Sequence, residues 1–342
     1  MSKRILSASR IKNLESCSYK YWCDYHLSLP SSQNSGAARG TVCHLILECL
    51  LDKKHRKYIK VLLKSGTIES VPSIVRLAKK ALKKEGKKQE FFNDENYELC
   101  DQMILVGLNC DFLGGKGAEI NSPEKEFLLE SEDPKYKIRG FIDKPIEYKK
   151  QKKIRIVDYK TSKGKFAKEE LDYNVQAMTY LLAAKQVWSE LEDSVVQFQF
   201  LKFPESPLQE IRHTDEQLRG FEDYLAVLYE IINNYTEETA HSNFASNQPF
   251  PKRDEGFKGP LNCGFAKSPG QLKKDGNPMW HCEYKFAYDY YVLLDGDGKV
   301  VKSTRDKEEL SGLEGATEKR YYEGCPAHAQ PHLQGQSDDF DF

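Results

Sequence analysis

The stretch that decides the fold is IVDYKTSKG, residues 156–164. An apolar run ends in an acid, an aromatic residue and a lysine, and then passes into a turn of Lys, Gly and Ser. Strand side chains alternate between two faces, so Ile154, Ile156, Asp158 and Lys160 share one face. Buried charges cost free energy unless they are paired. We therefore expect the acid and the lysine to line a site at the end of a buried strand.

A second acid ends the strand that precedes this one. Three short runs rich in β-branched and aromatic residues predict consecutive strands: EKEFLLE, YKIRGFIDKPIEY and KKIRIVDYK, at residues 124–130, 136–148 and 152–160. Neighbouring strands would bring Asp143 and Asp158 together, and a divalent cation with oxygen ligands relieves their repulsion. Lys160 beside them would hold a water or a phosphate oxygen. The alternative is a surface hairpin in which these charges form ordinary ion pairs.

Helical patterns surround the strands. The sequence predicts helices on both sides of the meander and further strands after it, which favours an α/β domain with a mixed sheet. Thr214 and Gln217 form a capping-box pattern. The expected helices span residues 7–29, 40–63, 168–188 and 214–235, with two more within 72–113, and the further strands span 195–203 and 207–213.

Composition sets broad limits on the class of protein. The chain has 342 residues, 39% hydrophobic and 30% charged, which is typical of a soluble globular protein. There are 51 Lys and Arg against 52 Asp and Glu, so net charge neither indicates nor excludes nucleic acid as a partner. The N-terminus lacks the apolar region of a signal peptide, and no run approaches the ~20 apolar residues of a membrane span. We expect a cytoplasmic chain with no membrane partner, whose nine cysteines are thiols or metal ligands.

Two helical patterns carry further candidates. Gln176 and Tyr180 are four residues apart and face the same way, so an amide and a phenol could bind a phosphate backbone or a base. The alternative is a half-buried surface helix. His44 lies among apolar residues and is either a core histidine or a metal ligand, which Glu48 one turn later could orient or join.

The motifs, taken in order, resemble a known family. They are G-x-x-x-H at residues 40–44, G-F-I-D at 140–143, I-V-D-Y-K-T-S at 156–162 and Q-x-x-x-Y at 176–180. This order resembles the RecB-like branch of the PD-(D/E)XK nuclease superfamily, which includes CRISPR-associated RecB-like exonucleases, the AddAB and RecBCD nuclease domains and many phage exonucleases. The resemblance covers roughly residues 5–205, including an N-terminal S-x-S-R-I-x-x-L-x-x-C-x-x-x-Y.

The resemblance implies a metal site. His44, Asp143, Asp158 and the backbone carbonyl of Tyr159 would bind Mg²⁺ or Mn²⁺. Family members often have Glu at the second acidic position, and Asp158 shortens the reach to the metal. The implied reaction is phosphodiester hydrolysis, in which a metal-bound water attacks in line.

The resemblance also implies the catalytic and substrate-binding residues. Asp143, Asp158 and Lys160 would be catalytic, and Gln176 and Tyr180 would contact DNA. These roles describe a DNA exonuclease in replication, recombination or repair, encoded by a phage or a bacterium and acting in the bacterial or infected-host cytoplasm. The alternatives are a catalytically inactive DNA-binding or assembly subunit, and a hydrolase of RNA or nucleotides.

Cysteines near both ends of the chain carry a separate expectation. Several relatives hold a [4Fe-4S] cluster with one cysteine on the N-terminal helix and three near the C-terminus, and Cys17, Cys263 and Cys282 match such positions. The pattern departs from the family because there is no C-x-x-C and Cys325 lies far from Cys282. A zinc site that includes His281, and unligated thiols, remain the alternatives.

The resemblance implies a restriction-endonuclease-like core in a nuclease domain of residues 1–240. Its helical N-terminal part would span 1–120 and its catalytic core 121–240. An irregular extension rich in Cys and aromatic residues, 241–330, would pack on the core. The acidic end, 331–342, is expected to be a disordered tail; the alternatives are a docking peptide for a replication or recombination protein and a DNA mimic.

Overall fold

The computed structural model describes residues 4–31, 35–85, 93–121, 123–242 and 263–329. The predicted acidic tail and the beginning of the extension lie outside this part of the chain. The chain divides into two compact units, of which the first comprises Met1–Ala8 with Gln33–Asn233 and the second comprises Ser9–Ser32 with Asn234–Phe342.

The predicted boundaries of the nuclease domain and the extension stay predictions, and in this division the second unit resumes at Asn234. Residues 9–32 group with the C-terminal part and not with the predicted nuclease domain. The prediction that the extension packs on the core stays a prediction.

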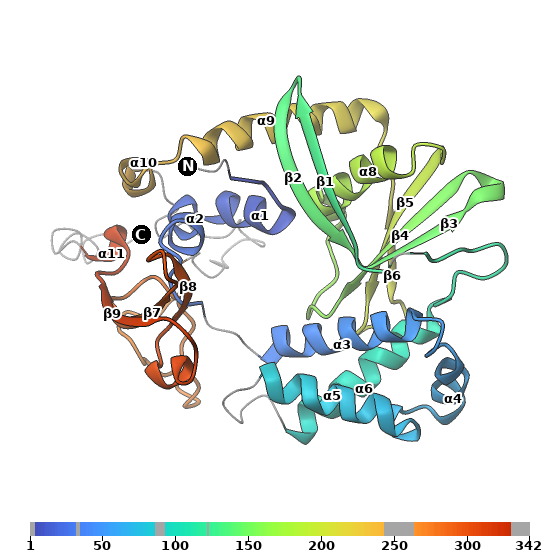
Figure 1. Ribbon diagram of the computed structural model, residues 1–342, viewed down its shortest axis with the longest axis horizontal. Helices are drawn as coiled ribbons and strands as arrows, with labels where there is room; N and C mark the ends of the chain where they lie inside the picture. Colours follow the sequence, from blue (N-terminus) through green and yellow to red (C-terminus); the bar gives the residue numbers. More distant parts are fainter. Residues whose placement is uncertain (1–3, 32–34, 86–92, 122, 243–262, 330–342) are drawn as a thin grey trace. The chain divides into compact units, whose positions relative to one another are not determined.

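Helices form one layer of the first unit: α3 (Ser35–Leu51), α4 (Lys57–Ser65), the short η1 (Ile68–Ser70), α5 (Pro72–Glu85) and α6 (Asp94–Asn109). Helix α3 packs against both α5 and α6 (Figure 1). The prediction of one helix over 40–63 was wrong, because the chain turns after Leu51. The Arg56 side chain donates to the Leu51 carbonyl at 2.9 Å and closes the end of α3.

The strands of the first unit form two sheets. Strands β1 (Lys125–Glu132) and β2 (Lys135–Ile142) form an antiparallel hairpin. The second sheet has the order β3-β4-β5-β6, with β4 and β5 parallel and the other pairs antiparallel. This confirms the predicted α/β class with a mixed sheet. Its strands are β3 (Lys144–Tyr148), β4 (Lys153–Lys160), β5 (Asp193–Phe200) and β6 (Leu208–Ile211), with η2 (Lys149–Gln151) between the first two.

The prediction of one strand over residues 136–148 was wrong, because the chain changes sheets at Asp143. Strand β2 ends at Ile142 and pairs with β1, whereas β3 begins at Lys144 and pairs with β4. Glu124 is the residue before β1, and its backbone N–H donates a hydrogen bond of 3.0 Å to the Asp143 carbonyl. The acid therefore lies at the crossover between the two sheets.

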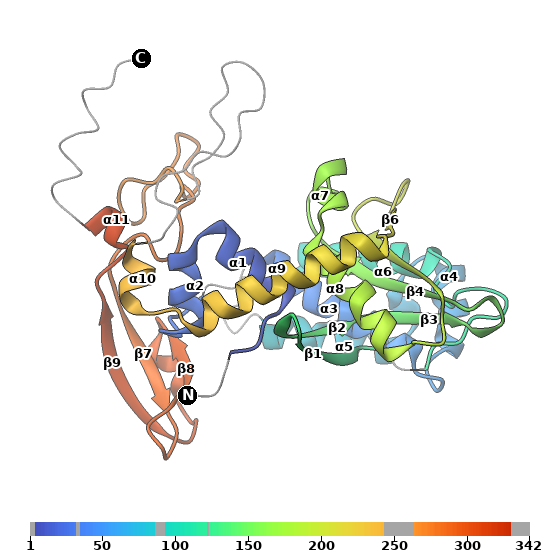
Figure 2. The ribbon, with the colours of Figure 1, turned by 90° about the horizontal axis from the view of Figure 1, so that it is seen from above.

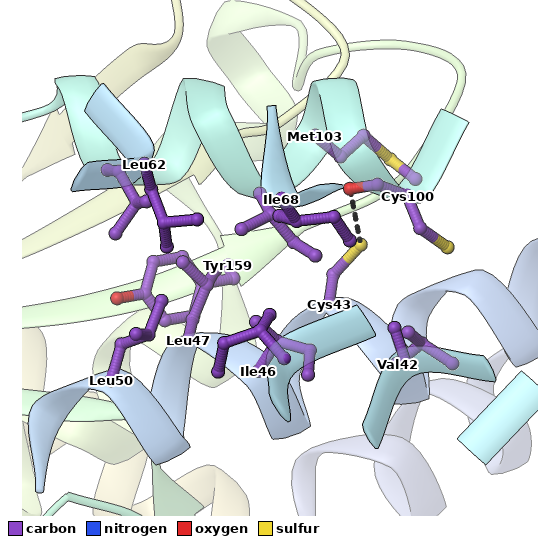
Figure 3. Packing of buried hydrophobic residues seen from close by; sticks show 14 of the residues in the cluster. Val42, Cys43, Ile46, Leu47, Leu50, Leu62, Ile68, Cys100, Met103 and Tyr159 are labelled. Atoms are coloured by element: carbon purple, nitrogen blue, oxygen red, sulfur yellow. Dashed lines mark hydrogen bonds between the residues drawn. The ribbon is translucent and has the colours of Figure 1, made fainter. Parts of the chain in front are cut away.

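A hydrophobic cluster joins the helical layer to the β3-β4-β5-β6 sheet. It contains side chains of α3 to α6 together with Ile146, Val157 and Tyr159 from the sheet. Figure 3 shows Leu47 and Leu50 of α3 beside the ring of Tyr159. This packing fixes α3 against the C-terminal end of β4.

Three helices follow β4 along the chain: α7 (Lys168–Asp172), α8 (Val175–Val187) and α9 (Asp215–Asn233). Helix α8 contacts β1, β2 and β5, and α9 contacts β2 and α8. The prediction of one helix over 168–188 was wrong, because Asn174 interrupts it and caps α8 by accepting from Ala177 N–H at 3.0 Å. The capping box that opens α9 is confirmed, with reciprocal Thr214–Gln217 hydrogen bonds of 2.9 and 3.3 Å.

The second unit combines short helices with an antiparallel sheet of order β8-β7-β9 (Figure 2). The prediction of one helix over 7–29 was wrong, because Cys17 is extended, with φ −165° and ψ 113°. The part expected to be irregular carries the sheet within residues 288–322. The elements are α1 (Ala8–Ser16), α2 (Ser18–Tyr25), α10 (Glu237–Ser242), β7 (Tyr288–Leu294), β8 (Val300–Thr304), η3 (Lys307–Leu310), β9 (Ala316–Tyr322) and α11 (Pro326–Ala329). No described helix is long and apolar enough to cross a membrane.

Candidate active site

The candidate site lies at the C-terminal end of β4, a strand that is covered on both faces. Val157 and Tyr159 point into the cluster with α3. Asp158, on the opposite face, meets side chains of α8 and is only 3% exposed. A carboxylate this deeply buried requires partners to stay ionised.

Three side chains supply those partners. Lys160 Nζ lies 2.7 Å from Asp158 Oδ2, while Gln176 Nε2 and Tyr180 OH lie 2.8 and 2.9 Å from Oδ1. Burial raises the pKa of Asp158 and the Lys160 ammonium opposes this effect, whereas the Asp143 charge adds to it. The acid and lysine of the opening motif are therefore paired within one site.

His44 connects the helical layer to Asp143 and to the end of β4. Its Nδ1 lies 3.3 Å from Asp143 Oδ1, and its Nε2 lies 3.0 Å from the Tyr159 carbonyl oxygen. Asp143 in turn accepts a hydrogen bond from Tyr159 N–H at 2.8 Å. Burial lowers the pKa of His44, but the hydrogen bond and charge of Asp143, with that of Asp158, raise it overall to about 9. His44 thus lies between two of the other predicted metal-binding groups, Asp143 and the Tyr159 carbonyl.

The surroundings of Gly40 explain why the G-x-x-x-H motif begins with glycine. It lies one helical turn before His44 on α3, and a Cβ atom at this position would be 3.1 Å from Thr161 Oγ1. The absence of a side chain lets α3 approach the loop that follows β4. This approach brings His44 within reach of Tyr159.

Gln176 and Tyr180 lie inside the site and bridge its charged groups. Gln176 Oε1 accepts from Lys160 Nζ at 2.6 Å, and its Nε2 donates to Asp158 and to Tyr180 OH, the latter at 2.7 Å. Tyr180 is 4% exposed. This geometry favours positioning of the acid and the lysine, and the predicted contact of the two residues with DNA stays a prediction.

Two further acids lie near Asp143. Burial, followed by the charges of Glu124 and Asp143, raises the pKa of Glu48. The spacing of one helical turn from His44 made Glu48 a candidate from the sequence. Nothing in the sequence pointed to Glu124, because it reaches the site only through the hydrogen bond between its backbone and Asp143.

The donor set fits a hard divalent cation. Among the residues that the structure describes, no three or more His, Cys, Asp or Glu side chains are already arranged to hold a metal ion. However, Asp158 Oδ2 is buried next to Lys160 Nζ, 2.7 Å away, and no other hydrogen-bond partner of this oxygen lies in the described part of the chain. Carboxylate and carbonyl oxygens with an imidazole suit Mg²⁺ or Mn²⁺.

A separate group of cysteines lies in the second unit. Cys17, Cys263, Cys282 and Cys325 line one pocket of about 230 Å³. The Cys282 N–H donates to the Cys263 carbonyl at 3.0 Å. Burial raises the pKa of Cys325 to about 12; a backbone hydrogen bond from Ala327 opposes this effect, and the charges of the other three cysteines add to it. The structure thus adds Cys325 to the three predicted positions, and none of the four forms a disulfide.

Comparisons with known proteins bear on the first unit above all. A family model described as the PD-(D/E)XK nuclease superfamily matches residues 5–256, which is most of the chain. A comparison with curated proteins found no match. A solved structure from Eubacterium rectale, named "Putative exonuclease", is 12% identical with a TM-score of 0.41 over 68% of this chain and 82% of that one. So distant a likeness adds nothing to the assignment.

Proposed function

Since the chain belongs to the PD-(D/E)XK nuclease superfamily, we propose that it is a metal-dependent exonuclease that hydrolyses DNA from strand ends during replication, recombination or repair. Family membership supports a nuclease; the substrate, mode and pathway are our proposal. The observation that carries it is the convergence of Asp143, Asp158 and Lys160 with His44 at one end of β4.

The metal-binding residues come from α3, β4 and the crossover at Asp143. His44, Asp143, Asp158 and the Tyr159 carbonyl would hold one or two Mg²⁺ or Mn²⁺ ions, which supply a Lewis acid and an activated water when bound. His44 loses a proton to become a ligand, because only a neutral imidazole nitrogen binds metal.

Lys160 is the group best placed to meet the phosphate. Its side chain is 22% exposed, whereas that of Asp158 is 4% exposed, so the ammonium lies on the solvent side of the pair. There it can bind a phosphate oxygen and neutralise developing negative charge. Gln176 fixes the ammonium through its Oε1 and the acid through its Nε2, so one amide sets their relative position.

The cysteine pocket fits a [4Fe-4S] cluster, which takes four thiolates. We propose this cofactor for the second unit, with Cys17, Cys263, Cys282 and Cys325 as its ligands. A single zinc ion held by the same thiols is the alternative. Iron, sulfide and zinc analysis of anaerobically purified protein separates the two.

Incubation of end-labelled linear DNA, closed circular DNA and RNA with Mg²⁺ or Mn²⁺ tests the function. We expect cleavage of linear DNA that stops in EDTA and in Lys160→Ala, while the variant still folds and binds DNA. Cleavage of circles would contradict the exonuclease mode, and cleavage of RNA alone would contradict the substrate. DNA binding with no cleavage of any substrate would favour the inactive assembly subunit.

A partner protein remains a separate proposal. A replication or recombination protein would dock on the acidic end of the chain, which lies outside the described residues. Deletion of residues 337–342 with unchanged activity and unchanged partner binding would contradict it.

A further inference from the structure

A cavity of about 640 Å³ opens beside the candidate active site, within the first unit. Its walls come mainly from α3 and α5, which lie side by side in Figure 1. The volume falls within the ~300–1,000 Å³ of sites that hold small ligands. The lining residues that matter here are His44, Leu45 and Glu48 from α3, and Leu77, Lys80 and Lys84 from α5.

One side of this cavity combines apolar and cationic groups. Leu77, Lys80, Ala81 and Lys84 all line it, and their spacing of three and four residues places them on one face of α5. Both lysines are exposed, and neither makes an ion pair with any residue in the described ranges. Leu45 of α3 extends the apolar surface. This side therefore offers an apolar surface with two ammonium groups available to an anion.

The acidic lining residues of the cavity belong to the candidate metal site. Glu48 and Glu124 line it together with His44, and the charges of Glu124 and Asp143 act on Glu48. Charge thus changes from acidic at the proposed metal to basic along α5. A polynucleotide strand matches this order, because one phosphate would meet the metal while a neighbouring phosphate meets the lysines.

We propose that this cavity binds one unpaired nucleotide of the DNA substrate next to the scissile phosphate, with its base against Leu45 and Leu77 and its phosphate on Lys80 and Lys84. This inference rests on the proposed nuclease function and narrows its substrate to strands with an unpaired end. A base held in a duplex would first have to unpair and unstack at a cost in free energy, so blunt duplex ends bind more weakly.

The test measures DNA affinity in EDTA, where no cleavage occurs, with fluorescent single-stranded oligonucleotides and blunt duplexes. We expect Lys80→Ala/Lys84→Ala to bind the single strand about tenfold more weakly, and its slope of log affinity against log salt to fall by about 1.4. The matched control is Lys79→Ala/Lys83→Ala, which removes the same charge from exposed positions of α5 that do not line the cavity. We expect less than about a threefold change in the control.

The base contact has its own test. Oligonucleotides with an abasic site in place of one terminal nucleotide, moved stepwise from the end, should bind the wild type about tenfold more weakly at one position. Leu77→Ala should lose this discrimination. Equal losses in the two lysine variants, no abasic effect, or equal affinity for single strand and blunt duplex would overturn the inference.

These outcomes are separate from the fate of the proposed function. If the wild type cleaves DNA and the two lysine variants bind alike, the cavity inference fails while the nuclease stands. If the wild type neither binds nor cleaves DNA, both fail.

Discussion

Lys144 allows a quantitative test of how the core beside the site is built. It is the first residue of β3, its exposed fraction is 0%, and its ammonium lies 3.2 Å from the Phe112 carbonyl oxygen. The rings of Phe112 and Tyr159 flank it, with centroids at 4.5 and 5.2 Å. Burial, aided by the Arg155 charge, lowers the pKa of Lys144 to about 7. We predict that Lys144→Met, whose uncharged side chain is one heavy atom shorter, stabilises the protein at neutral and acidic pH.

The sign and size follow from this pKa. The ordinary value is 10.5, so between pH 7 and 10.5 the unfolded chain binds a proton that the folded protein does not. Wild-type stability therefore rises with pH across this window, by at most about 1.4 kcal/mol per unit and about 5 kcal/mol in all. Below pH 7 the cost of burying the charge is fully present. The carbonyl and ring contacts return about 1–3 kcal/mol. The net gain expected for Lys144→Met at pH 6 is about 2–4 kcal/mol, shrinking towards pH 10.

Urea unfolding at pH 6, 7, 8 and 9 in EDTA measures this gain, since the chelator removes any metal ion bound at the neighbouring Asp143. Lys150→Met, an exposed lysine in the turn between β3 and β4, is the control and should change stability by less than about 0.5 kcal/mol at every pH. A Lys144→Met protein that is less stable than wild type at pH 6, or whose advantage does not change with pH, would refute the reasoning.

Three other predictions concern the proposed metal, the bridging amide and the cysteine pocket. Below pH 9 the protonated His44 must release a proton to bind metal, so the apparent Mn²⁺ affinity of metal-free protein should rise up to about tenfold per pH unit until about pH 9. Calorimetry should show no such rise in His44→Ala. A rise that persists in this variant would exclude His44 as the source of the pH dependence. Gln176→Leu should lower kcat at least about tenfold, because the hydrogen bonds that position Lys160 and Asp158 are both lost. The affinity for single-stranded DNA should stay unchanged. A loss of affinity with unchanged kcat would instead support a direct contact between Gln176 and DNA. Cys325→Ser should lower the iron and sulfide content and the visible absorbance of anaerobically purified protein, whereas unchanged iron would remove this residue from the proposed ligands.

Periodicity was enough to predict which residues of two pairs in the site share a face. A period of two placed Asp158 and Lys160 on one face of a strand, and the structure pairs them there. A spacing of four placed Gln176 and Tyr180 on one face of a helix, where they meet each other and Asp158. These relations are local, so neighbouring residues along the chain fix them.

Relations set by the tertiary fold left no comparable signal. The change of sheet at Asp143 interrupts a run that is apolar and β-branched on both sides, so composition predicted one strand. Cys282 and Cys325 are separated in sequence by the sheet over residues 288–322. Cys325 reaches the pocket of the other cysteines only because the chain returns there after the last strand of this sheet. Partners of Gln176 depend on where α8 packs, which its own residues do not specify.

The discontinuous second unit has a consequence for protein synthesis. Residues 9–32 leave the ribosome early, yet the remainder of their unit begins at Asn234, roughly 200 residues later. At ~5–20 residues per second, that interval lasts about 10–40 s. During it the nascent chain carries Ile11, Tyr21 and Cys23, all fully buried in the finished protein, before the later residues of their own unit exist. Expression of the first unit alone therefore calls for removal of residues 9–32 as well as the segment after Asn233, since a simple C-terminal truncation would leave an apolar segment prone to aggregation.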